Sequence, residues 1–478
     1  MEINLPKGTH DVILDEARGF QYIEETMKGI ADAYGFNEMR TPIFEHTELF
    51  QRSVGESSDV VRKEMYTFLD KGNRSITLRP EITAGIMRSI VTNKLYATQQ
   101  DLPIKAWYLG PTFRYERPQA GRFRQFNQFG VESVGINSYL ADAEVIMLGY
   151  TSLLLLGFKN VTLKINTLGD KQSRDNYRIA LKQYFEKHIE SMCPDCKQRY
   201  EINPLRILDC KVPEDQELCK NAPKMSDYLS AEAKEYFDKI CKVLDSYQIK
   251  YEIDDGLVRG LDYYSHVVFE FHYTSKNGMN LGAIGAGGHY DNLLSEVGGP
   301  SYAGVGYAFG VERVYSVMKD EGLLPSNSDA HHISVMALDD SALLMGYDLA
   351  TALRASGFRT DYMLEAKGFK QHFKRAERKG SLVACIIGEN EIKNNVVIVR
   401  DLEKQEQREI PNEHVIEVVE QLIVSKEQEK MHHCDCGCEH DEHECCCGNE
   451  HDEDHECCCG HDHDDGEHEC HCGHHHRK

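Results

Sequence analysis

The last 48 residues of this chain cannot form a hydrophobic core. Residues 431–478 contain 11 cysteines, 13 histidines and 15 acidic residues, with almost no apolar side chain. Such a segment cannot bury enough apolar surface to offset the conformational entropy that folding costs, so we expect it to be disordered without metal. Folding is therefore confined to the preceding 430 residues. That length is enough for two or three domains of ~100–200 residues each.

Metal-binding side chains are concentrated in this tail. The sequence His-Glu-Cys-Cys-Cys-Gly begins at His443 and recurs at His455, and a related sequence begins at His468. Thiolate and imidazole groups favour Zn²⁺, Ni²⁺ or Cu(I) over Mg²⁺. A passive acidic tail is the alternative, but the density of ligands favours a metal-buffering or metal-sensing appendage that binds Zn²⁺ or Ni²⁺. Its thiol ligands would be Cys434, Cys436, Cys438, Cys445, Cys446, Cys447, Cys457, Cys458, Cys459, Cys470 and Cys472.

The composition of the whole chain limits its location and its partners. The formal net charge is −24, and the tail contributes −13 of it. An acidic total does not exclude a nucleic-acid partner, because local patches of charge determine that contact. No apolar run reaches the ~18 residues of a membrane span, and the N-terminus lacks a secretory pattern. Because only six cysteines precede residue 431, we expect a cytoplasmic protein with no membrane partner.

Hydrophobic periodicity divides the rest of the chain. Apolar residues at helical spacing predict an amphipathic helix over 20–34, and strict alternation predicts a strand over 265–273. Strands alternate with helices over 331–425, which predicts a small α/β domain with a largely parallel sheet. The larger domain before it, 1–325, carries a mostly helical insertion at about 171–247.

Three arginines occur in sequence contexts that suit polyphosphate binding. Arg114 lies in Phe-Arg-Tyr-Glu, Arg259 in Arg-Gly-Leu-Asp-Tyr-Tyr, and Arg313 in Gly-Val-Glu-Arg. The guanidinium group stays charged at every relevant pH and presents a planar set of donors to phosphate oxygens. Surface ion pairs would explain one such arginine, but not the glycine-rich and carboxylate-rich sequences around all three.

Two further segments carry polar groups suited to ligands. Residues 106–132 predict a strand, a loop and a second strand, and basic and amide side chains on the loop suit phosphates and base edges. An isolated loop of this kind is more often simply solvated. Glu81 and Thr83 could accept hydrogen bonds from an α-ammonium group, although such a pair also often caps the start of a helix.

Together these segments resemble the histidyl-tRNA synthetases, a family of class II aminoacyl-tRNA synthetases, over roughly residues 1–425. Two segments, 256–264 and 285–291, resemble sequences of the histidine-specific enzymes, and they distinguish this family from the other class II synthetases. The three motifs of the class resemble residues 35–69, 106–132 and 304–313. The family's fold would be an α+β catalytic domain with an antiparallel sheet, followed by an α/β anticodon-binding domain.

The resemblance also implies an activity, namely ATP-dependent ligation of L-histidine to tRNA(His) through a histidyl-adenylate, by a homodimer with Mg²⁺ beside the ATP. ATP would be bound by Arg114, Glu116 and Arg313. Catalysis would depend on Arg259, Arg114 and Gln128. Histidine would be bound by Glu81, Thr83, Arg114, Gln128, Glu132, Arg259, Tyr263, Tyr264 and Tyr290.

Contacts with tRNA are implied in two regions. On the loop of the second motif they would be Gln119, Arg122 and Arg124. In the second domain they would be Lys370 and Lys374, on a helix with six cations against one acid. Such a helix is usually only a solvated face, but the resemblance favours contact with tRNA.

Two positions depart from the family's pattern. Ile82 stands where a glycine often occurs, and His289 stands where an arginine is expected before Tyr290. Neither change removes a donor or acceptor assigned above, but the second lowers the local positive charge by one, which bears on the affinity for ATP or the adenylate there.

The insertion contains a possible metal site. Cys193 and Cys196 have the spacing of the first half of a zinc site, and Cys210 and Cys219 follow. The wider spacing of the second pair weakens this interpretation. We therefore expect reduced, partly buried thiols, with zinc at Cys193 and Cys196 as the alternative.

Two other interpretations of the whole chain are open. A synthetase-like regulatory subunit of histidine biosynthesis would share the catalytic fold but lack the anticodon domain. A metal-handling protein with a relic synthetase body is the second. The three arginines and the second domain favour the enzyme.

Overall fold

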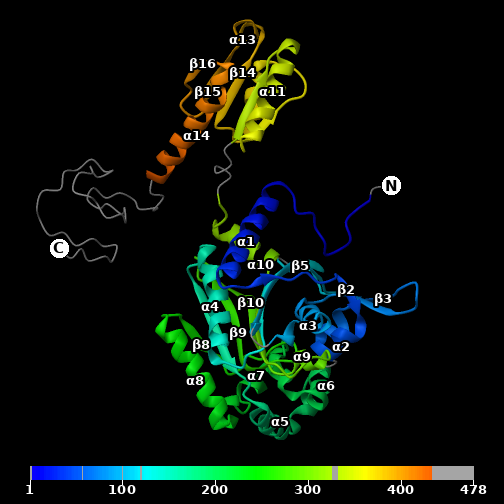
Figure 1. Cartoon of the computed structure of the whole chain (residues 1–478). Helices are drawn as coiled ribbons and strands as arrows, with labels where there is room; N and C mark the ends of the chain where they lie inside the picture. Colours follow the sequence, from blue (N-terminus) through cyan, green and yellow to red (C-terminus); the bar gives the residue numbers. More distant parts are fainter. Residues whose placement is uncertain (1–2, 56–57, 99–100, 119–120, 326–331, 433–478) are drawn as a thin grey trace, which may run out of the picture. The chain divides into compact units, whose positions relative to one another are not determined.

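The computed structural model (Figure 1) describes residues 3–55, 58–98, 101–118, 121–325 and 332–432. The tail and its predicted metal ligands lie outside the described residues. By contacts the chain divides into two compact units, Met1–Pro325 and Ser326–Lys478. No helix in the described ranges combines the length and the apolar character needed to cross a membrane.

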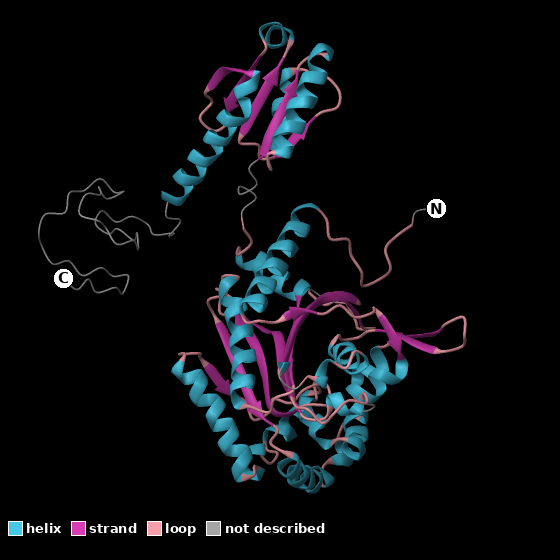
Figure 2. Cartoon of the chain, viewed as in Figure 1, coloured by secondary structure: helices cyan, strands magenta, loops and turns pink. Residues whose placement is uncertain are grey.

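The first unit is built on an eight-stranded sheet, seen in Figure 2 as a curved layer with helices around it. Neighbouring strands are antiparallel except for the two edge pairs, β1–β5 and β7–β8. This confirms the antiparallel sheet expected for the catalytic domain. In spatial order the strands are β1 (Asn37–Glu38), β5 (Ile104–Phe113), β6 (Gln125–Val134), β11 (Gly304–Gly310), β10 (Asn280–Tyr290), β9 (Ser265–Thr274), β7 (Val161–Thr167) and β8 (Tyr251–Ile253).

Helices α1 (Leu14–Ala33), α4 (Tyr139–Leu155) and α10 (Val311–Glu321) pack on the sheet in one large core. The buried face of α1 includes Phe20, Ile23 and Met27, as its helical spacing predicts. The helix ends before Gly35, whose φ of +77° places it in the left-handed region that favours glycine.

A smaller core occupies the opposite face of the strands that carry the second motif. On β5, Trp107 packs in the large core, whereas Ala106 and Tyr108 pack in the smaller one with apolar residues of the helices. Alternate residues of a strand point to opposite faces, so Tyr108 faces away from α1. The elements on this side are α3 (Thr83–Thr92), α9 (Leu293–Glu296), α2 (Thr47–Val54), the π-helical turn η1 (Val60–Glu64), and a three-stranded sheet of β2 (Phe44–His46), β4 (Ser75–Leu78) and β3 (Tyr66–Leu69).

The insertion is helical, as predicted, but it is not a separate body. It shares a core with Leu257, Tyr264 and Val268 of the catalytic sheet and its loops. Helix α8 also contributes Phe237 and Ile240 to the large core beside α4. The elements are α5 (Lys171–Glu186), η4 (Ile189–Ser191), α6 (Pro194–Ile202), η5 (Pro204–Asp209), α7 (Pro213–Lys220), η6 (Met225–Tyr228) and α8 (Ala231–Ser246).

The second unit has a five-stranded sheet in the order β13-β12-β14-β15-β16. The expectation of a largely parallel sheet is wrong for half of it: β12 pairs in parallel with β13 and β14, but β15 is antiparallel to both its neighbours. A parallel crossover needs a dozen or more residues, and the connection between β14 and β15 is shorter. The elements are β12 (His332–Ala337), α11 (Leu343–Ala355), β13 (Arg359–Tyr362), α12 (Phe369–Arg378), β14 (Val383–Ile387), α13 (Glu389–Asn394), β15 (Val396–Asp401), β16 (Gln407–Pro411) and α14 (Val415–His432).

A buried charged network connects three elements of the first unit. Nδ1 of His289 on β10 lies 2.9 Å from Oδ1 of Asp142 on α4, and Nε2 lies 3.3 Å from Oδ1 of Asp291. The Tyr236 hydroxyl of α8 donates to the other oxygen of Asp142 at 2.9 Å. Burial alone would lower the pKa of His289, but the charge of Asp142 and the hydrogen bonds to both carboxylates raise this pKa to about 10.

This network predicts a pH-dependent stability. The stabilisation by His289 is complete below its unfolded pKa of ~6.5 and is lost as pH rises toward about 10. We expect His289→Gln to lower the free energy of unfolding by about 3–5 kcal/mol at pH 6. The difference from the unmodified protein should shrink steadily up to pH 9.5, as measured by urea unfolding. His46→Gln, at an exposed position, is the matched control, and a pH-independent difference would contradict the assignment.

Candidate functional site

A cavity of about 150 Å³ lies among the central strands and helix α3 of the first unit. All nine residues that the sequence predicted to bind histidine line this cavity. They come from five separate stretches of the chain, and the antiparallel sheet brings them together. The lining consists of Glu81, Thr83, Tyr108, Arg114, Gln128, Glu132, Arg259, Leu261, Tyr263, Tyr264, Ala286, Tyr290, Gly306, Tyr307 and Ala308.

Two glycines leave the space in which the cavity side chains fit. Gly306 on β11 lies directly opposite Glu132 on β6, and a Cβ at Gly306 would lie 2.0 Å from Oε2 of Glu132. On β6 itself, Gly130 lies between Gln128 and Glu132 on the same face. A Cβ there would lie 2.4 Å from the Tyr108 hydroxyl. Both positions therefore require glycine for the cavity to exist.

Glu132 is the most completely enclosed acid of the cavity, with 2% of its surface exposed. Its Oε1 accepts hydrogen bonds from Thr83 Oγ1 at 2.8 Å and from the Tyr108 hydroxyl at 3.2 Å. Its Oε2 accepts from the Tyr290 hydroxyl at 2.7 Å. Burial raises the pKa of Glu132 to about 8 despite these donors. The cavity therefore holds a carboxyl group that a cationic or N–H-donating ligand would stabilise in its ionised form.

Glu81 both caps a helix and lines the cavity. Its carboxylate accepts from the backbone N–H of Ala84 at 3.0 Å, at the first turn of α3. The helix-capping alternative weighed for the sequence is therefore observed, and it holds the side chain in place at the cavity wall. Burial raises the pKa of Glu81.

Among the nine residues predicted to bind histidine, two polar atoms are buried without a partner. Oε1 of Gln128 and Nε of Arg259 find no hydrogen-bond partner among the described residues. The Arg259 guanidinium is held from its other end, because Nη1 lies 2.5 Å from Oε1 of Glu270. Glu270 in turn contacts Nε2 of His272 at 2.8 Å. Since buried polar atoms normally have partners, the two free atoms indicate a ligand with both donor and acceptor groups.

Arg114 links this cavity to a second, more open hollow of about 630 Å³. Its Nε donates to the Pro80 carbonyl at 2.9 Å, and its Nη1 lies 4.0 Å from Oε1 of Glu116. Glu116 lines the second hollow and not the first. The second hollow is lined by Lys63, Glu64, Tyr115, Glu116, Arg117, Pro118 and Arg122.

Arg313 lies near this second hollow, on the first turn of α10. Its Nη2 donates to the Leu281 carbonyl, and its Cδ lies 3.2 Å from where a Cβ of Gly121 would stand. Burial, and then the positive charge of Arg122, lowers the pKa of Arg313. Two guanidinium groups thus lie close enough to repel each other, and an anion between them would relieve that repulsion.

The residues predicted to contact tRNA differ in their availability. Gln119 lies outside the described residues. Arg122 is exposed, whereas Arg124 stacks on the Tyr115 ring at 3.9 Å and donates to the Glu116 carbonyl. Lys370 and Lys374 are exposed on α12. Two of the six cations predicted on that helix and just before it are instead engaged, since Arg375 pairs with Asp361 and Lys367 with Glu365.

Sequence reasoning placed one residue wrongly and missed others. His289 does not line the cavity; it points into the opposite face of β10 and belongs to the network with Asp142. The expected loss of positive charge at the nucleotide therefore does not follow from this substitution. Tyr108 and Tyr307 line the cavity and were missed. The alternation on β5 could have found Tyr108, because it shares a face with Ala106, which packs below the cavity.

Comparisons with known proteins agree with this geometry. Residues 8–314 match the family model of histidyl-tRNA synthetase, and residues 332–422 match the anticodon binding domain. The histidine–tRNA ligase of Lactiplantibacillus plantarum is 43% identical over 424 residues, covering 88% of this chain and all of that protein. That of Thermosipho melanesiensis is 44% identical over 417 residues, covering 87% of this chain and 98% of that protein. The crystal structure of apo Staphylococcus aureus histidyl-tRNA synthetase matches with a TM-score of 0.75 at 35% identity, covering 87% of this chain and all of that one.

The antiparallel sheet with its enclosed polar cavity, followed by an anticodon-binding domain, defines a class II aminoacyl-tRNA synthetase. Within that class the chain belongs to the histidyl-tRNA synthetase family, and its enzyme class is histidine–tRNA ligase. The regulatory-subunit and relic interpretations are not supported, because both domains of the ligase match over their length.

The fit of Gly306 against Glu132 predicts the effect of one added methyl group. Gly306→Ala would displace the Glu132 carboxylate, and a displacement of ~1 Å in such a site costs on the order of 10²-fold in rate. We expect kcat/KM for histidine to fall by about that factor in an aminoacylation assay. Gly29→Ala, where a Cβ meets nothing within 4 Å, is the matched control. Unchanged kcat/KM in Gly306→Ala would show that Glu132 does not shape the cavity.

Proposed function

We propose that the cavity binds L-histidine and activates it with ATP before transfer to tRNA(His). The observation that supports this best is the convergence of nine predicted residues on one cavity, with Gln128 Oε1 and Arg259 Nε left free for a ligand. The reaction has two steps. First, histidine and ATP give histidyl-adenylate and diphosphate; then the histidyl group passes to the terminal ribose of the tRNA, with release of AMP.

The imidazole of the substrate lies against Glu132 and Tyr264 in this proposal. An imidazole has two ring nitrogens, so a carboxylate and a phenol placed around it can bind both. The raised pKa of Glu132 supports this role, because a bound N–H donor would stabilise the carboxylate. The α-amino group is bound by Glu81, Thr83 and Gln128. Tyr263 and Tyr290 line the rest of the histidine pocket. Sites that hydrogen-bond a side chain reject analogues that lack it by ~10⁴ or more.

ATP lies across the open side of the cavity and the adjoining hollow. Arg114, which lines the cavity and approaches Glu116, binds the α-phosphate, and Glu116 binds the adenine edge. Arg313 binds the γ-phosphate, where its repulsion with Arg122 favours an anion. Mg²⁺ fits a hollow that also contains the Glu64 carboxylate, since it prefers hard oxygen ligands, most of which the phosphates supply. It would neutralise phosphate charge when bound.

Little covalent work falls to the protein in the first step. A carboxylate oxygen of histidine forms a bond to the α-phosphorus, and the bond from that phosphorus to the bridging oxygen breaks as diphosphate leaves. Arg259 and Arg114 stabilise the negative charge on the α-phosphate. Glu270 holds the Arg259 guanidinium so that little reorganisation is needed as charge develops. In the second step the ribose hydroxyl attacks the histidyl carbonyl carbon and AMP leaves.

Contacts with tRNA extend the site beyond the cavity. Arg122 and Arg124 with Gln119 lie beside the acceptor end, and Lys370 and Lys374 on α12 contact the anticodon arm. The exposed side chains on α12 and the match of the second unit to an anticodon-binding domain support this assignment. Cations on an exposed helix bind phosphates with strong dependence on salt.

The enzyme is proposed to be a cytoplasmic homodimer. The segment 35–69 exposes several large apolar side chains that a partner subunit would cover. They are Ile43, Phe44, Phe68 and Leu69, with 44%, 57%, 47% and 65% of their surface exposed. Clustered apolar exposure of this kind marks protein interfaces.

The role of Arg259 can be separated from substrate binding. We expect Arg259→Ala to lower histidine-dependent ATP–pyrophosphate exchange by about 10²–10³-fold in kcat, the usual cost of losing one donor to developing charge. The KM for histidine should change far less. Arg178→Ala, at an exposed position of the same charge on α5, is the control and should retain full exchange. Exchange supported equally by other amino acids would contradict the proposed substrate.

The tail is proposed to bind a transition metal independently of catalysis. Its 11 cysteines and 13 histidines support this, with Zn²⁺ or Ni²⁺ as the metal. We expect the full chain to bind several more Zn²⁺ ions than a chain that ends at residue 430, as measured by competition with a chromophoric chelator. The shorter chain should aminoacylate tRNA(His) at the same rate. Binding no tighter than millimolar, or loss of activity on truncation, would contradict the proposal.

A further inference from the structure

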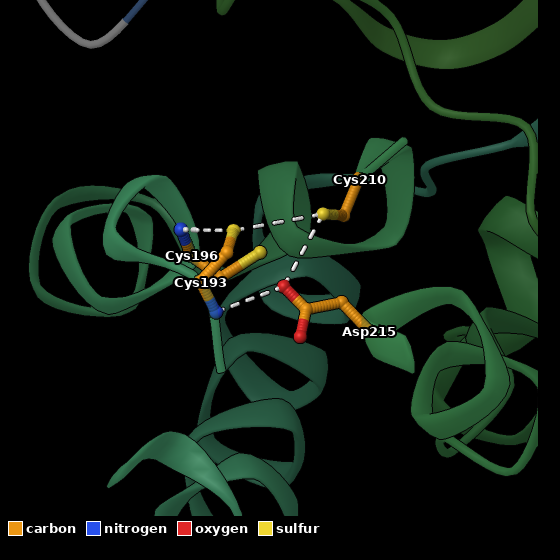
Figure 3. Close-up of side chains that lie close together, drawn as sticks. All are labelled: Cys193, Cys196, Cys210 and Asp215. Carbon is orange, nitrogen blue, oxygen red and sulfur yellow. Dashed lines mark hydrogen bonds between the residues drawn. The ribbon is translucent and has the colours of Figure 1, made fainter. Parts of the chain in front are cut away.

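Three sulfur atoms and one carboxylate converge inside the insertion. Figure 3 shows Cys193, Cys196, Cys210 and Asp215 pointing toward one another. One ligand atom from each lies within 4.8 Å of the others. Cys193 and Cys196 begin α6, Cys210 follows η5, and Asp215 lies in the first turn of α7. Cys219, which the sequence had placed with Cys210, is not in the cluster, and its thiol donates to the Ile207 carbonyl.

The spacing of the sulfur atoms matches a shared metal. Sγ of Cys193 lies 3.8 Å from Sγ of Cys210. Two sulfurs bound to one zinc at ~2.3 Å with a tetrahedral angle lie about 3.8 Å apart. A disulfide would need a separation of ~2.05 Å, and the six cysteines in the described residues are all free.

The backbone around the cluster is arranged to stabilise thiolates. The N–H of Cys196 donates to Sγ of Cys193 at 3.4 Å, and the N–H of Val212 donates to Sγ of Cys210 at 3.4 Å. Both cysteines therefore sit in tight turns in which an amide points at the sulfur. Such amides favour the anionic form of the ligand.

Asp215 is buried without a compensating cation. Only 2% of its surface is exposed, and its Oδ2 accepts from the Cys193 N–H at 3.1 Å and from the Cys210 thiol at 3.4 Å. No basic side chain in the described part of the chain forms an ion pair with it. Buried carboxylates are normally paired with a cation or bound to a metal. The pattern points to a missing positive charge at the centre of the cluster.

We propose that Cys193, Cys196, Cys210 and Asp215 bind one Zn²⁺ ion in a tetrahedral site with three sulfur ligands and one oxygen ligand. Thiolate-rich tetrahedral sites select zinc over the hard cations Mg²⁺ and Ca²⁺. Four protein ligands leave no open position, so the site is structural and not catalytic. Three of its four ligands are buried, and the fourth is half-buried, which suits a closed site.

The ion would hold both ends of a segment that positions the catalytic loop. Between Cys193 and Cys210, the Arg206 guanidinium donates to the Gly260 carbonyl, next to Arg259. Asn203 donates to Asp262 at 3.0 Å, farther along the same loop. Fixing the ends of this segment restricts the motion of its middle, so metal binding stabilises the loop that carries Arg259.

The site can be tested by counting metal on a chain that ends at residue 430, which removes the ligands of the tail. The solved relative is covered over its whole length by 87% of this chain, so the tail is not needed for the fold. After loading with Zn²⁺ and dialysis against a weak chelator, we expect one zinc per chain by elemental analysis. Cys210→Ser and Asp215→Asn should each lower zinc retention at least tenfold. Cys219→Ser, which changes a thiol outside the cluster, should retain the full equivalent.

A second readout does not depend on the variants folding as well as the unmodified chain. Zn²⁺ should raise the melting temperature of the chain and of Cys219→Ser, and replacement by Co²⁺ should give the absorption of tetrahedral cobalt thiolate. No retained zinc in the chain that ends at residue 430, with its four ligands intact, would overturn the proposal. It would also be overturned by full retention in Cys210→Ser, or by a disulfide found on thiol counting without reductant. None of these measurements uses aminoacylation, so their outcome is independent of the proposed function.

Discussion

The buried Glu132 carboxyl group, facing a glycine across two paired strands, is the constraint on which the cavity depends. Three hydroxyl groups from three different elements hold its oxygens. Burial nevertheless raises its pKa to about 8, so the empty cavity keeps an acid in an unfavourable environment. A substrate with N–H donors would bind at this point and stabilise the ionised carboxylate. Strands β6 and β11 must therefore keep their register, because a slip of one residue would put a side chain where Gly306 now lies.

The arginines around the cavity are held by groups that leave their charge available. Arg114 is fixed by the Pro80 carbonyl, Arg313 by the Leu281 carbonyl, and Arg259 by Glu270. Carbonyl oxygens accept hydrogen bonds without neutralising the guanidinium. Arg259 has a close carboxylate partner, and Arg114 has a more distant one in Glu116 at 4.0 Å. The Nε of Arg259 has no hydrogen-bond partner among the described residues. The enclosed cavity thus combines buried carboxyl groups with two guanidinium groups, and cations outnumber acids in the lining of the adjoining hollow. This arrangement suits an ammonium-bearing substrate and a polyphosphate.

The insertion contributes to the site although none of its residues lines the cavity. It shares a core with Tyr264 and Leu257, and Arg206 and Asn203 hold the loop next to Arg259. Arg199 also pairs with Asp59 at 2.7 Å, which joins α6 to the residue before η1. Displacement of this helical segment would therefore reach the loop that carries Arg259 through these hydrogen bonds as well as through the shared core. The residues of the cysteine cluster flank Asn203 and Arg206 in the chain.

The sequence alone determined the elements and most of the cavity lining. The period of α1 and the alternation of β9 were predictable, because local periodicity is a property of short segments. The nine cavity residues were predicted from the resemblance of the motif sequences to the family. Packing decided the rest. The direction of β15 followed from a short connection, and the orientation of His289 from which face of β10 the cavity occupies. The approach of Asp215, and not Cys219, to the cysteine cluster followed from the way α7 packs against η5. Each depends on contacts between residues far apart in the chain, which spacing along the sequence does not encode.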